Sequence, residues 1–363
     1  MATSYGKNIS ISIYGGSHDS EIGVYAKGLP RGFSVDLDAL SAFMARRAPG
    51  RSRYATPRKE ADVPVFLSGL NADGTLSGDT LHAVIYNSNQ HSSDYASLAN
   101  IPRPNHADYA ARMKYGEAVD LRGGGHFSGR LTAPLCIVGG ICLQYLASLG
   151  ITVGAHLYAV GGVHDTPYPD TLLDASLLRK AAASDFPVLD GAAGERMRAV
   201  IAGASSMGDS VGAIIECGAV GLPAGLGEHM FDGVENRISS IVFGIPAVKG
   251  IEFGNGFACA AMTGSRNNDP FLTDGKRVFT ATNHCGGILG GMTSGMPLIF
   301  RVAMKPTPSI FCEQDSVDLS AMQPVKLRIK GRHDPCVAVR AVPVLEAACA
   351  IALVDLLLDG ADE

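Results

Sequence analysis

The sequence lacks the paired cysteines of a zinc site or a redox centre. Its eight cysteines are scattered along 363 residues, and none belongs to a C-x-x-C pair. This spacing argues against a structural zinc site, and we expect reduced thiols and no bound metal. The start of the chain, MATSYGK, also lacks the apolar core of a secretory signal peptide. Together these absences predict a cytoplasmic protein.

The sequence also lacks a long uncharged apolar run. Residues 131–149 are interrupted by a proline and a glycine pair, and residues 341–358 contain Glu346 and Asp355. A membrane-spanning helix needs about 20 apolar residues, and acidic residues inside a membrane are costly. We therefore interpret both segments as buried helices, with no membrane partner. A helix that is apolar nearly all round must be covered by protein on every side.

Basic charge is not in excess, and the common nucleotide-binding fingerprints are missing. The net charge of −5 argues against a nucleic-acid binder, which would usually be basic. Neither G-x-G-x-x-G within regular strand–helix alternation nor G-x-x-x-x-G-K-S/T occurs, which excludes Rossmann and P-loop folds. No low-complexity linker divides the chain, so we expect a single composite catalytic domain over residues 1–363.

A weak internal repeat is visible instead. A strand, a turn containing G-L-P and a helix recur in the same order, at 20–27, 28–32 and 36–47 and again at 210–218, 221–225 and 231–242. Each half then ends in a loop rich in arginine and glycine that leads into one apolar helix. This common order favours an internal duplication with intertwined repeats of roughly 8–150 and 207–359. Chance similarity is the competing explanation for any single match.

Further strands are predicted at 81–86, 212–217 and 297–303, which are short runs bounded by glycine, serine or proline. Two antiparallel sheets on either side of the apolar helices would explain why those helices lack a polar face. We therefore predict an α+β fold. It is a β-α-β sandwich with a central layer of apolar helices between antiparallel sheets, internally pseudo-duplicated.

Glycine and clustered arginine are what the sequence has in abundance. The 44 glycines, many in pairs or triplets, mark places where the backbone turns sharply or approaches a ligand closely. Residues 46–59 contain six cationic side chains, and glycine and proline interrupt helical spacing there. Arginines on a loop can converge on carboxylates and phosphate through bidentate contacts. A solvated charged face is the alternative interpretation.

Two glycine-rich loops are candidate phosphate-binding segments. Residues 122–130, RGGGHFSGR, place backbone N–H groups, a serine and two arginines before the first apolar helix. Residues 283–291, NHCGGILGG, are followed at 305–309 by KPTPS, in which two prolines hold a lysine, a threonine and a serine together. For each loop, a tight turn without a ligand is the alternative.

Three histidines stand beside small or acidic residues. They are His18 in GSHD, His106 in NHAD and His333 in the dipeptide HD. A single histidine of this kind is more often structural than catalytic, but three near glycine or proline favour acid–base chemistry near neutral pH. None has the H-E-x-x-H spacing of a metal site.

These segments resemble the signatures of the chorismate synthase family. The blocks of that family occur in order between residues 15 and 346, as GGSHD, RRAPG, RPNHAD, RGGGHFS, PAVKGIE, GGILGG, KPTPS and GRHDPC. The resemblance implies the sandwich fold with its pseudo-repeat, and a homotetramer. It also implies conversion of 5-enolpyruvylshikimate 3-phosphate to chorismate and phosphate by a 1,4-anti elimination, in the shikimate pathway to aromatic amino acids. The family requires reduced FMN without net redox change, supplied by an NADPH-linked reductase or by the protein's own use of NADPH.

The resemblance also implies roles for individual residues. His18 would protonate the departing phosphate, and His106 would protonate or hold the reduced flavin. Asp334 would help the flavin to accept the substrate proton, with Ser17 and Ser128 as relays. The substrate's carboxylates and phosphate would be bound by Arg47, Arg53 and Arg130. The positions that match FMN contacts are His126, Phe127, Ser128, Pro246, Ala247, Gly290, Lys305, Pro306, Thr307, Pro308, Ser309 and Arg332.

Four positions depart from the pattern of the family. Gly16 stands where glutamate is common, Asp19 where glycine is usual, Asn105 where glycine precedes the histidine, and His126 where arginine is common. The first two flank His18, and the last changes a flavin contact. The alternative function is therefore a non-catalytic flavin- or nucleotide-binding protein on the same fold. A transferase acting on phosphorylated shikimates would share the arginine loops but would not need the flavin-site segments.

Overall fold

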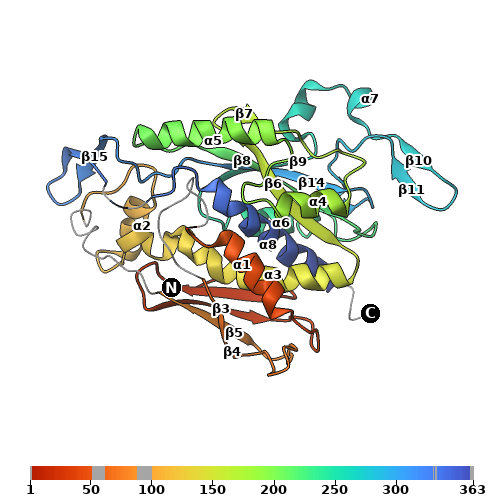
Figure 1. Cartoon of the computed structure of the whole chain (residues 1–363), viewed down its shortest axis with the longest axis horizontal. Coiled ribbons are helices and arrows are strands. Elements are labelled where there is room, and N and C mark those ends of the chain that lie inside the picture. Colours follow the sequence, from red (N-terminus) through yellow and green to blue (C-terminus); the bar gives the residue numbers. More distant parts are fainter. Residues whose placement is uncertain (1, 51–61, 88–99, 330, 332, 360–363) are drawn as a thin grey trace.

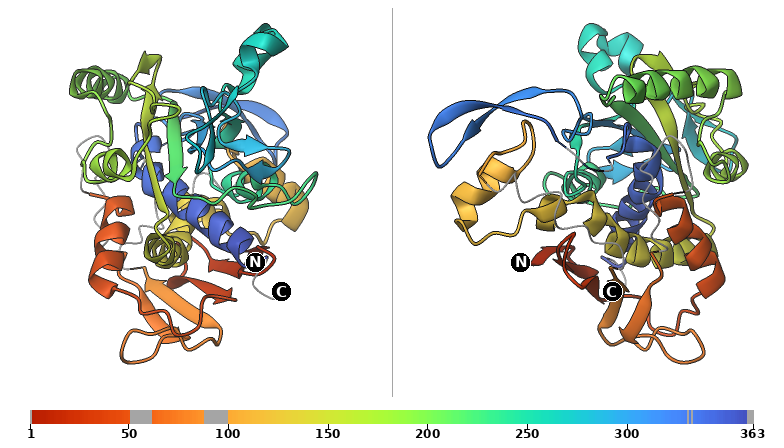
Figure 2. Two further views of the ribbon diagram at one scale, coloured as in Figure 1. Left: turned by 90° about the vertical axis from the view of Figure 1, so that its right-hand side faces the viewer. Right: turned by 60° about the vertical axis from the view of Figure 1, so that its left-hand side comes forward.

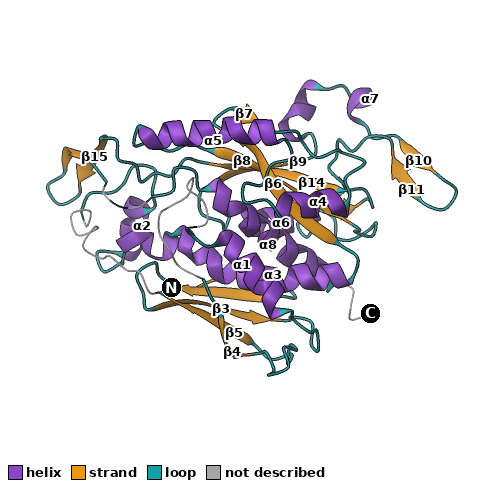
Figure 3. Cartoon of the chain, viewed as in Figure 1, coloured by secondary structure: helices purple, strands orange, loops and turns teal. Residues whose placement is uncertain are grey.

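The chain folds into layers of sheet, helix and sheet. The computed structural model describes residues 2–50, 62–87, 100–329, 331 and 333–359. Figure 1 shows the helices of the middle layer between one sheet below and another above, and Figure 3 shows the same layers coloured by secondary structure. Further helices lie beyond the upper sheet, and the turned views of Figure 2 show the same order.

The first sheet is built from the N-terminal part of the chain. It contains β1 (Ala2–Tyr5), β2 (Ser10–Gly15), β3 (Glu21–Lys27), β4 (Val65–Ser68) and β5 (Leu81–Tyr86), in the antiparallel order β1-β2-β3-β5-β4. Along β3, Ile22 and Val24 are fully buried whereas Tyr25 is exposed. Successive side chains of a strand point to opposite faces, so one face of this sheet covers the core and the other meets solvent.

The second sheet is covered on both faces. It contains β6 (Thr152–Val160), β7 (Val163–His164), β8 (Ala213–Val220), β9 (Val248–Phe253) and β14 (Leu298–Met304), in the antiparallel order β7-β6-β8-β14-β9. Its outer face packs against α4 (Ala175–Ala182) and α5 (Gly191–Ser206). The inner face packs against the helical layer.

The middle layer contains α1 (Leu37–Arg47), α3 (Thr132–Ser148), α6 (Val234–Val242) and α8 (Ala338–Leu357). The two apolar helices lie side by side, with α3 towards the first sheet and α8 towards the second. Gly139 makes this close approach feasible, because a Cβ there would lie 2.2 Å from Cβ of Ala347. The glycine pair that interrupts the apolar run of α3 is therefore a helix-packing contact.

Two acidic residues of α8 tie the layers together. Glu346 accepts two hydrogen bonds from the guanidinium of Arg46, at 2.6 and 2.8 Å. The fully buried carboxylate of Asp355 accepts from the backbone N–H groups of Asn8 and Ile9 at 2.7 Å and from Arg237 at 2.5 Å. Buried charges are tolerated when they are paired and hydrogen-bonded, and these two explain why the apolar segment 341–358 carries acids.

Helix α3 with the turn before it, Gly129–Ser148, is long and apolar enough to cross a membrane by length and composition alone, and 72% of its most apolar window is buried inside the protein. Burial on this scale is what the interpretation of residues 131–149 as a core helix requires.

The smaller described elements are α2 (Asp108–Tyr115), α7 (Gly264–Asn267), β10 (Phe271–Thr273), β11 (Val278–Thr280), β12 (Ile288–Leu289), β13 (Met292–Thr293), β15 (Gln314–Asp318) and β16 (Gln323–Leu327). Short 3-10 turns, Arg122–Phe127 and Gly129–Leu131, lead into α3, and another covers Gly256–Ala261.

Most predicted elements are confirmed to within a few residues, but both ends of one strand and the start of one helix are wrong. Strand β8 runs from Ala213 to Val220 instead of starting at 210 or 212 and ending at 217 or 218. Gly218 does not end it, because this residue is paired with Gly154 on one side and Ile299 on the other. The helix predicted from 231 begins at Val234, since Gly233 is its N-cap in an extended conformation.

Four strands of the first sheet, β2, β3, β5 and β4, correspond in chain order and position to β6, β8, β14 and β9 of the second. The edge strands differ, because β1 precedes β2 in the chain whereas β7 follows β6. In each half, a helix follows the central strand and an apolar helix follows the sheet. This correspondence supports our proposal of an internal duplication. Strands β6 and β7 precede residue 207, so the second sheet also uses strands from outside the predicted repeat.

Candidate active site

A cavity of about 870 Å³ lies where the N-terminal ends of α3 and α8 approach residues 243–249 and 304–309. Ligand pockets of enzymes usually measure about 300–1,000 Å³. Asp334 is the only acidic side chain among the described residues that line this cavity. Six lining side chains are cationic: Arg47, Arg103, Arg130, Lys249, Lys305 and Arg340. Four of these arginines are paired with Asp62, Asp108 or Asp334, but cations still outnumber carboxylates at the cavity of this chain, whose net charge is −5.

The triglycine loop separates two histidines. Gly123, Gly124 and Gly125 have φ values of 59°, 93° and 52°, a left-handed backbone that favours glycine. A Cβ on Gly123 would lie 2.6 Å from the imidazole of His18, and one on Gly124 would lie 3.4 Å from Nε2 of His106. The absence of side chains on this loop therefore allows both imidazoles to approach it closely.

His18 is buried directly after β2 and lies behind Gly123; it is not among the residues that line the cavity. The backbone N–H of Ser17 donates to the carbonyl of Gly125 at 3.0 Å and anchors this turn to the loop. The hydroxyl of Ser17 is buried and has no hydrogen-bond partner among the described residues. A Cβ on Gly16 would lie 3.2 Å from Oδ2 of Asp19, so Asp19 brings a carboxylate beside the position where relatives carry glutamate.

His106 lines the cavity and is held by residues of its own segment. Its Nδ1 lies 2.7 Å from Oδ1 of Asp108 and 3.2 Å from Nη2 of Arg103. Burial lowers the pKa of His106, and the positive charges of Arg103 and Lys305 lower it further. The hydrogen bond to Asp108 raises the pKa but does not outweigh these effects. The imidazole of His106 is therefore neutral near neutral pH.

Asn105 is one of the departures from the family pattern, and its backbone conformation explains why asparagine can replace glycine there. Its φ is 57°, in the left-handed region that glycine adopts freely and that asparagine tolerates better than most residues. This turn points the carbonyl of Asn105 towards Lys305, whose ammonium donates to it. Burial and the neighbouring charge of Lys249 lower the pKa of Lys305. Ala247, whose carbonyl accepts from the N–H of Lys305 at 2.9 Å, also has a positive φ of 78°.

Two predicted substrate residues are joined by a carboxylate. Asp62 accepts from Arg47 at 2.5 Å and from Arg130, and all three side chains are buried. Burial opposes ionisation of Asp62, but the charges and hydrogen bonds of Arg47 and Arg130 outweigh it and lower the pKa of the carboxyl. Arg47 also donates to the carbonyl of Gly129 at 2.9 Å. Arg53 lies outside the described residues.

Asp334 is on the cavity wall beside the start of α8. Nη1 of Arg340 lies 2.8 Å from Oδ2 of Asp334, and Nε of Arg340 donates to the carbonyl of Arg47 at 3.2 Å. The predicted proton-handling carboxylate is thereby connected to the backbone of Arg47, one of the predicted substrate-binding arginines.

The predicted FMN contacts fall mostly around this cavity. Nδ1 of His126 donates to the carbonyl of Gly15 at 2.8 Å. Gly290, in the turn between β12 and β13, and Pro306 are not among the lining residues, and Arg332 lies outside the described residues. The predicted contacts that do line the cavity are His126, Phe127, Ser128, Pro246, Ala247, Lys305, Thr307, Pro308 and Ser309.

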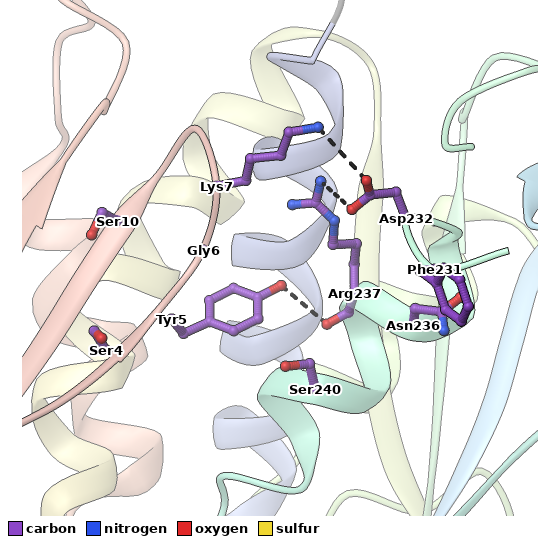
Figure 4. Close-up of a pocket in the computed structure, with 10 residues that line it drawn as sticks. All are labelled: Ser4, Tyr5, Gly6, Lys7, Ser10, Phe231, Asp232, Asn236, Arg237 and Ser240. Atoms are coloured by element: carbon purple, nitrogen blue, oxygen red, sulfur yellow. Dashed lines mark hydrogen bonds and ion pairs between the residues drawn. The ribbon is translucent and has the colours of Figure 1, made fainter. Parts of the chain in front are cut away.

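A second, more open pocket of about 420 Å³ lies between the β1–β2 turn and α6 (Figure 4). Its cations are already paired: Arg237 lies 3.1 Å and Lys7 lies 3.9 Å from the carboxylate of Asp232. The hydroxyl of Tyr5 donates to the carbonyl of Arg237 at 3.0 Å. This pocket joins the first sheet to α6. None of the predicted acid–base groups lines it, whereas His106, Ser128 and Asp334 line the larger cavity.

Sequence reasoning missed five residues of the site. Asp108 and Arg103 lie inside the RPNHAD block and could have been found from their spacing around His106. Lys249 and Arg340 also lie in or beside signature blocks. Asp62 has no local signal, because only the folded chain brings it between Arg47 and Arg130.

Fold and cavity together define a class of protein. It is an α+β sandwich with a cationic cavity, a buried histidine and a half-buried one, suited to acid–base chemistry on a ligand with several negative charges. The family model described as chorismate synthase matches residues 9–358, and the chain belongs to the chorismate synthase family.

Individual relatives agree over the whole chain. The chorismate synthase of Lancefieldella parvula is 45% identical over 100% of this chain and 98% of its own length. That of Thermococcus kodakarensis is 44% identical over 97% of both chains. A solved structure, "Crystal Structure of Chorismate Synthase", has a TM-score of 0.75 and 27% identity, and the match covers 98% of this chain and 93% of that chain.

Proposed function

We propose that the chain catalyses the 1,4-anti elimination of phosphate from 5-enolpyruvylshikimate 3-phosphate, which gives chorismate and phosphate, with reduced FMN as cofactor. It would be a carbon–oxygen lyase of the shikimate pathway. The observation that carries the proposal is the cationic cavity beside His18 and His106. A substrate with two carboxylates and a phosphate needs preorganised cations on several sides.

The residues around the cavity fit a flavin mononucleotide. The hydroxyl of Thr307 is buried without a hydrogen-bond partner among the described residues, and Lys305 and Ser309 lie beside it in sequence and on the cavity wall. These three side chains would hold the phosphate group of FMN, and Phe127, Pro246 and Ala247 would contact the remainder. When bound, reduced FMN supplies electron density that weakens the bond between carbon and the departing phosphate.

The proton-handling groups would be divided between the two sides of the triglycine loop. His18 would protonate the departing phosphate. His106, with Nε2 towards Gly124, would gain a proton on Nε2 when the anionic flavin binds, since a nearby anion favours the protonated imidazole, and would then protonate or hold the flavin. Asp334, held by Arg340, would help the flavin to accept the substrate proton, with Ser17 and Ser128 as relays.

The arginines would bind the substrate's anionic groups. Arg47 and Arg130 are held near one point by Asp62, and a substrate carboxylate or phosphate would replace Asp62 as their partner. Arg53 would supply a further cation. Gly290, Pro306 and Arg332 complete the set of proposed FMN contacts.

The test is phosphate release from the substrate with FMN under reducing and oxidising conditions. We expect release only when the flavin is reduced. His18→Ala and His106→Ala should each lower turnover by about 10²-fold or more, the usual scale for a lost general acid or base, while FMN and substrate affinities change far less. His229→Ala, at an exposed histidine, is the control. Protein that binds FMN but releases no phosphate when reduced would instead be the non-catalytic flavin-binding protein.

We further propose a cytoplasmic homotetramer whose reduced flavin comes from NADPH, directly or through a reductase. Light scattering of the purified protein tests the tetramer. Oxidation of NADPH by the purified protein with FMN alone would show that the chain needs no separate reductase.

A further inference from the structure

The carboxylate of Asp108 lies beside the proposed flavin site, and both of its oxygens have close polar partners. It is buried at the first position of α2. Its Oδ2 accepts from the backbone N–H of Arg103 at 3.0 Å and from Nε of the same residue at 2.7 Å. Its Oδ1 accepts from Nη2 of Arg103 at 2.7 Å and lies 2.7 Å from Nδ1 of His106. The orientation of the carboxylate is therefore set by the backbone and guanidinium of one residue.

Nδ1 of His106 has two neighbours that require opposite protonation. Asp108 is an acceptor at 2.7 Å and requires a hydrogen on Nδ1, whereas Nη2 of Arg103 is a donor at 3.2 Å and requires a lone pair there. The contact with the anionic oxygen is shorter, and charge-assisted hydrogen bonds of this length are the stronger kind. A hydrogen on Nδ1 satisfies this shorter, charged contact, and Nε2 of the neutral imidazole then carries the lone pair.

We propose that Asp108 is the positioning residue of the reaction: it holds His106 as the Nδ1–H tautomer and keeps a lone pair on Nε2 beside Gly124 and the cavity. The link to turnover rests on the proposed function, but the tautomer is a property of the free protein. Burial opposes ionisation of Asp108, yet the hydrogen bonds from Arg103 and His106 hold its pKa well below its usual range. The acceptor is thus present throughout the neutral range.

The tautomer can be measured without activity. In FMN-free protein labelled with ¹⁵N-histidine, proton–nitrogen correlation spectra distinguish Nδ1–H from Nε2–H, and His106→Ala identifies the signals of His106. We expect the Nδ1–H pattern in the wild type. Asp108→Asn can turn its NH₂ group towards Nδ1, so we expect the Nε2–H pattern in that variant. Its turnover should fall by about 10²-fold, while FMN and substrate dissociation constants stay within a few-fold.

Asp274→Asn is the matched control, because Asp274 also accepts from a backbone N–H and a guanidinium of one arginine but lies in an exposed turn. It should change neither the His106 signals nor turnover. An Nε2–H pattern for His106 in the wild type overturns the proposal, whatever the Asp108 variant shows. So does a retained Nδ1–H pattern in Asp108→Asn, or a changed tautomer with normal turnover. If the wild type and Asp108→Asn show the expected tautomers but the wild type releases no phosphate, the proposed function is refuted and the assignment of the tautomer stands.

Discussion

Replacing Gly123 by alanine tests whether the triglycine loop positions His18. An added Cβ would lie 2.6 Å from Cδ2 and Nε2 of the imidazole and 2.8 Å from Oγ of Ser17. Carbon atoms in favourable contact are about 3.5–4.0 Å apart, so the imidazole must retreat by about 1 Å. The backbone cannot easily move instead of the imidazole, because the N–H of Ser17 is hydrogen-bonded to the carbonyl of Gly125.

The size of the effect can be worked out from two terms. A φ of 59° costs an L-residue about 1–2 kcal/mol, and overpacking adds about 1–3 kcal/mol. The total is below the 5–15 kcal/mol by which native proteins are usually stable, so the variant should still fold. A displacement of about 1 Å at a catalytic group can lower turnover by about 10²-fold.

The assay is steady-state phosphate release with reduced FMN, alongside chemical unfolding of the same samples. Gly150→Ala is the matched control: its φ is 78°, but nothing lies within 4 Å of the added Cβ. It should lose about 1–2 kcal/mol of stability and retain full turnover. Near-normal turnover in Gly123→Ala, in a folded protein, would show that His18 does not act at the position that the loop imposes.

Three further predictions concern binding and stability. Arg47→Ala should weaken substrate binding by about 2–5 kcal/mol in calorimetry while FMN affinity stays within a few-fold; the opposite pattern would assign Arg47 to the flavin. His126→Ala should weaken FMN binding by about 1.5–3 kcal/mol in calorimetry, because Nδ1 of His126 already donates to the carbonyl of Gly15 and so holds the ring on the cavity wall. An unchanged FMN affinity would exclude His126 as a flavin contact. Asp355→Ala should lower the free energy of unfolding by about 3–5 kcal/mol, because the N–H groups of Asn8 and Ile9 lose their acceptor and Arg237 loses the shortest of its ion pairs. A loss as small as that of Asp315→Ala, which removes an exposed ion pair, would contradict this.

The layers of the fold could be predicted because their signals are local. The segments that became α3 and α8 are apolar on all sides, so they must be covered on every side, and two sheets with the helices between them satisfy that pattern. Short runs bounded by glycine, serine and proline located β5 and β14. The predicted boundaries of β8 and α6 were wrong because a glycine can lie inside an element or end it. Gly218 lies inside β8, whereas Gly233 precedes α6.

The same local reasoning located His106, the triglycine loop and the cationic segments, because each is a short run of unusual composition. The pairings across the chain had no such signal. Asp62 meets Arg47 and Arg130, His18 meets Gly123, and Asp355 meets the N-terminal strand turn only after distant segments pack together.

These contacts depend on which distant segments of the chain lie close together in space. Residue type and local spacing do not reveal this. They settle properties that composition leaves open. Whether an arginine is already paired, whether a histidine is neutral, and which of its nitrogens carries the proton all follow from neighbours contributed by the fold.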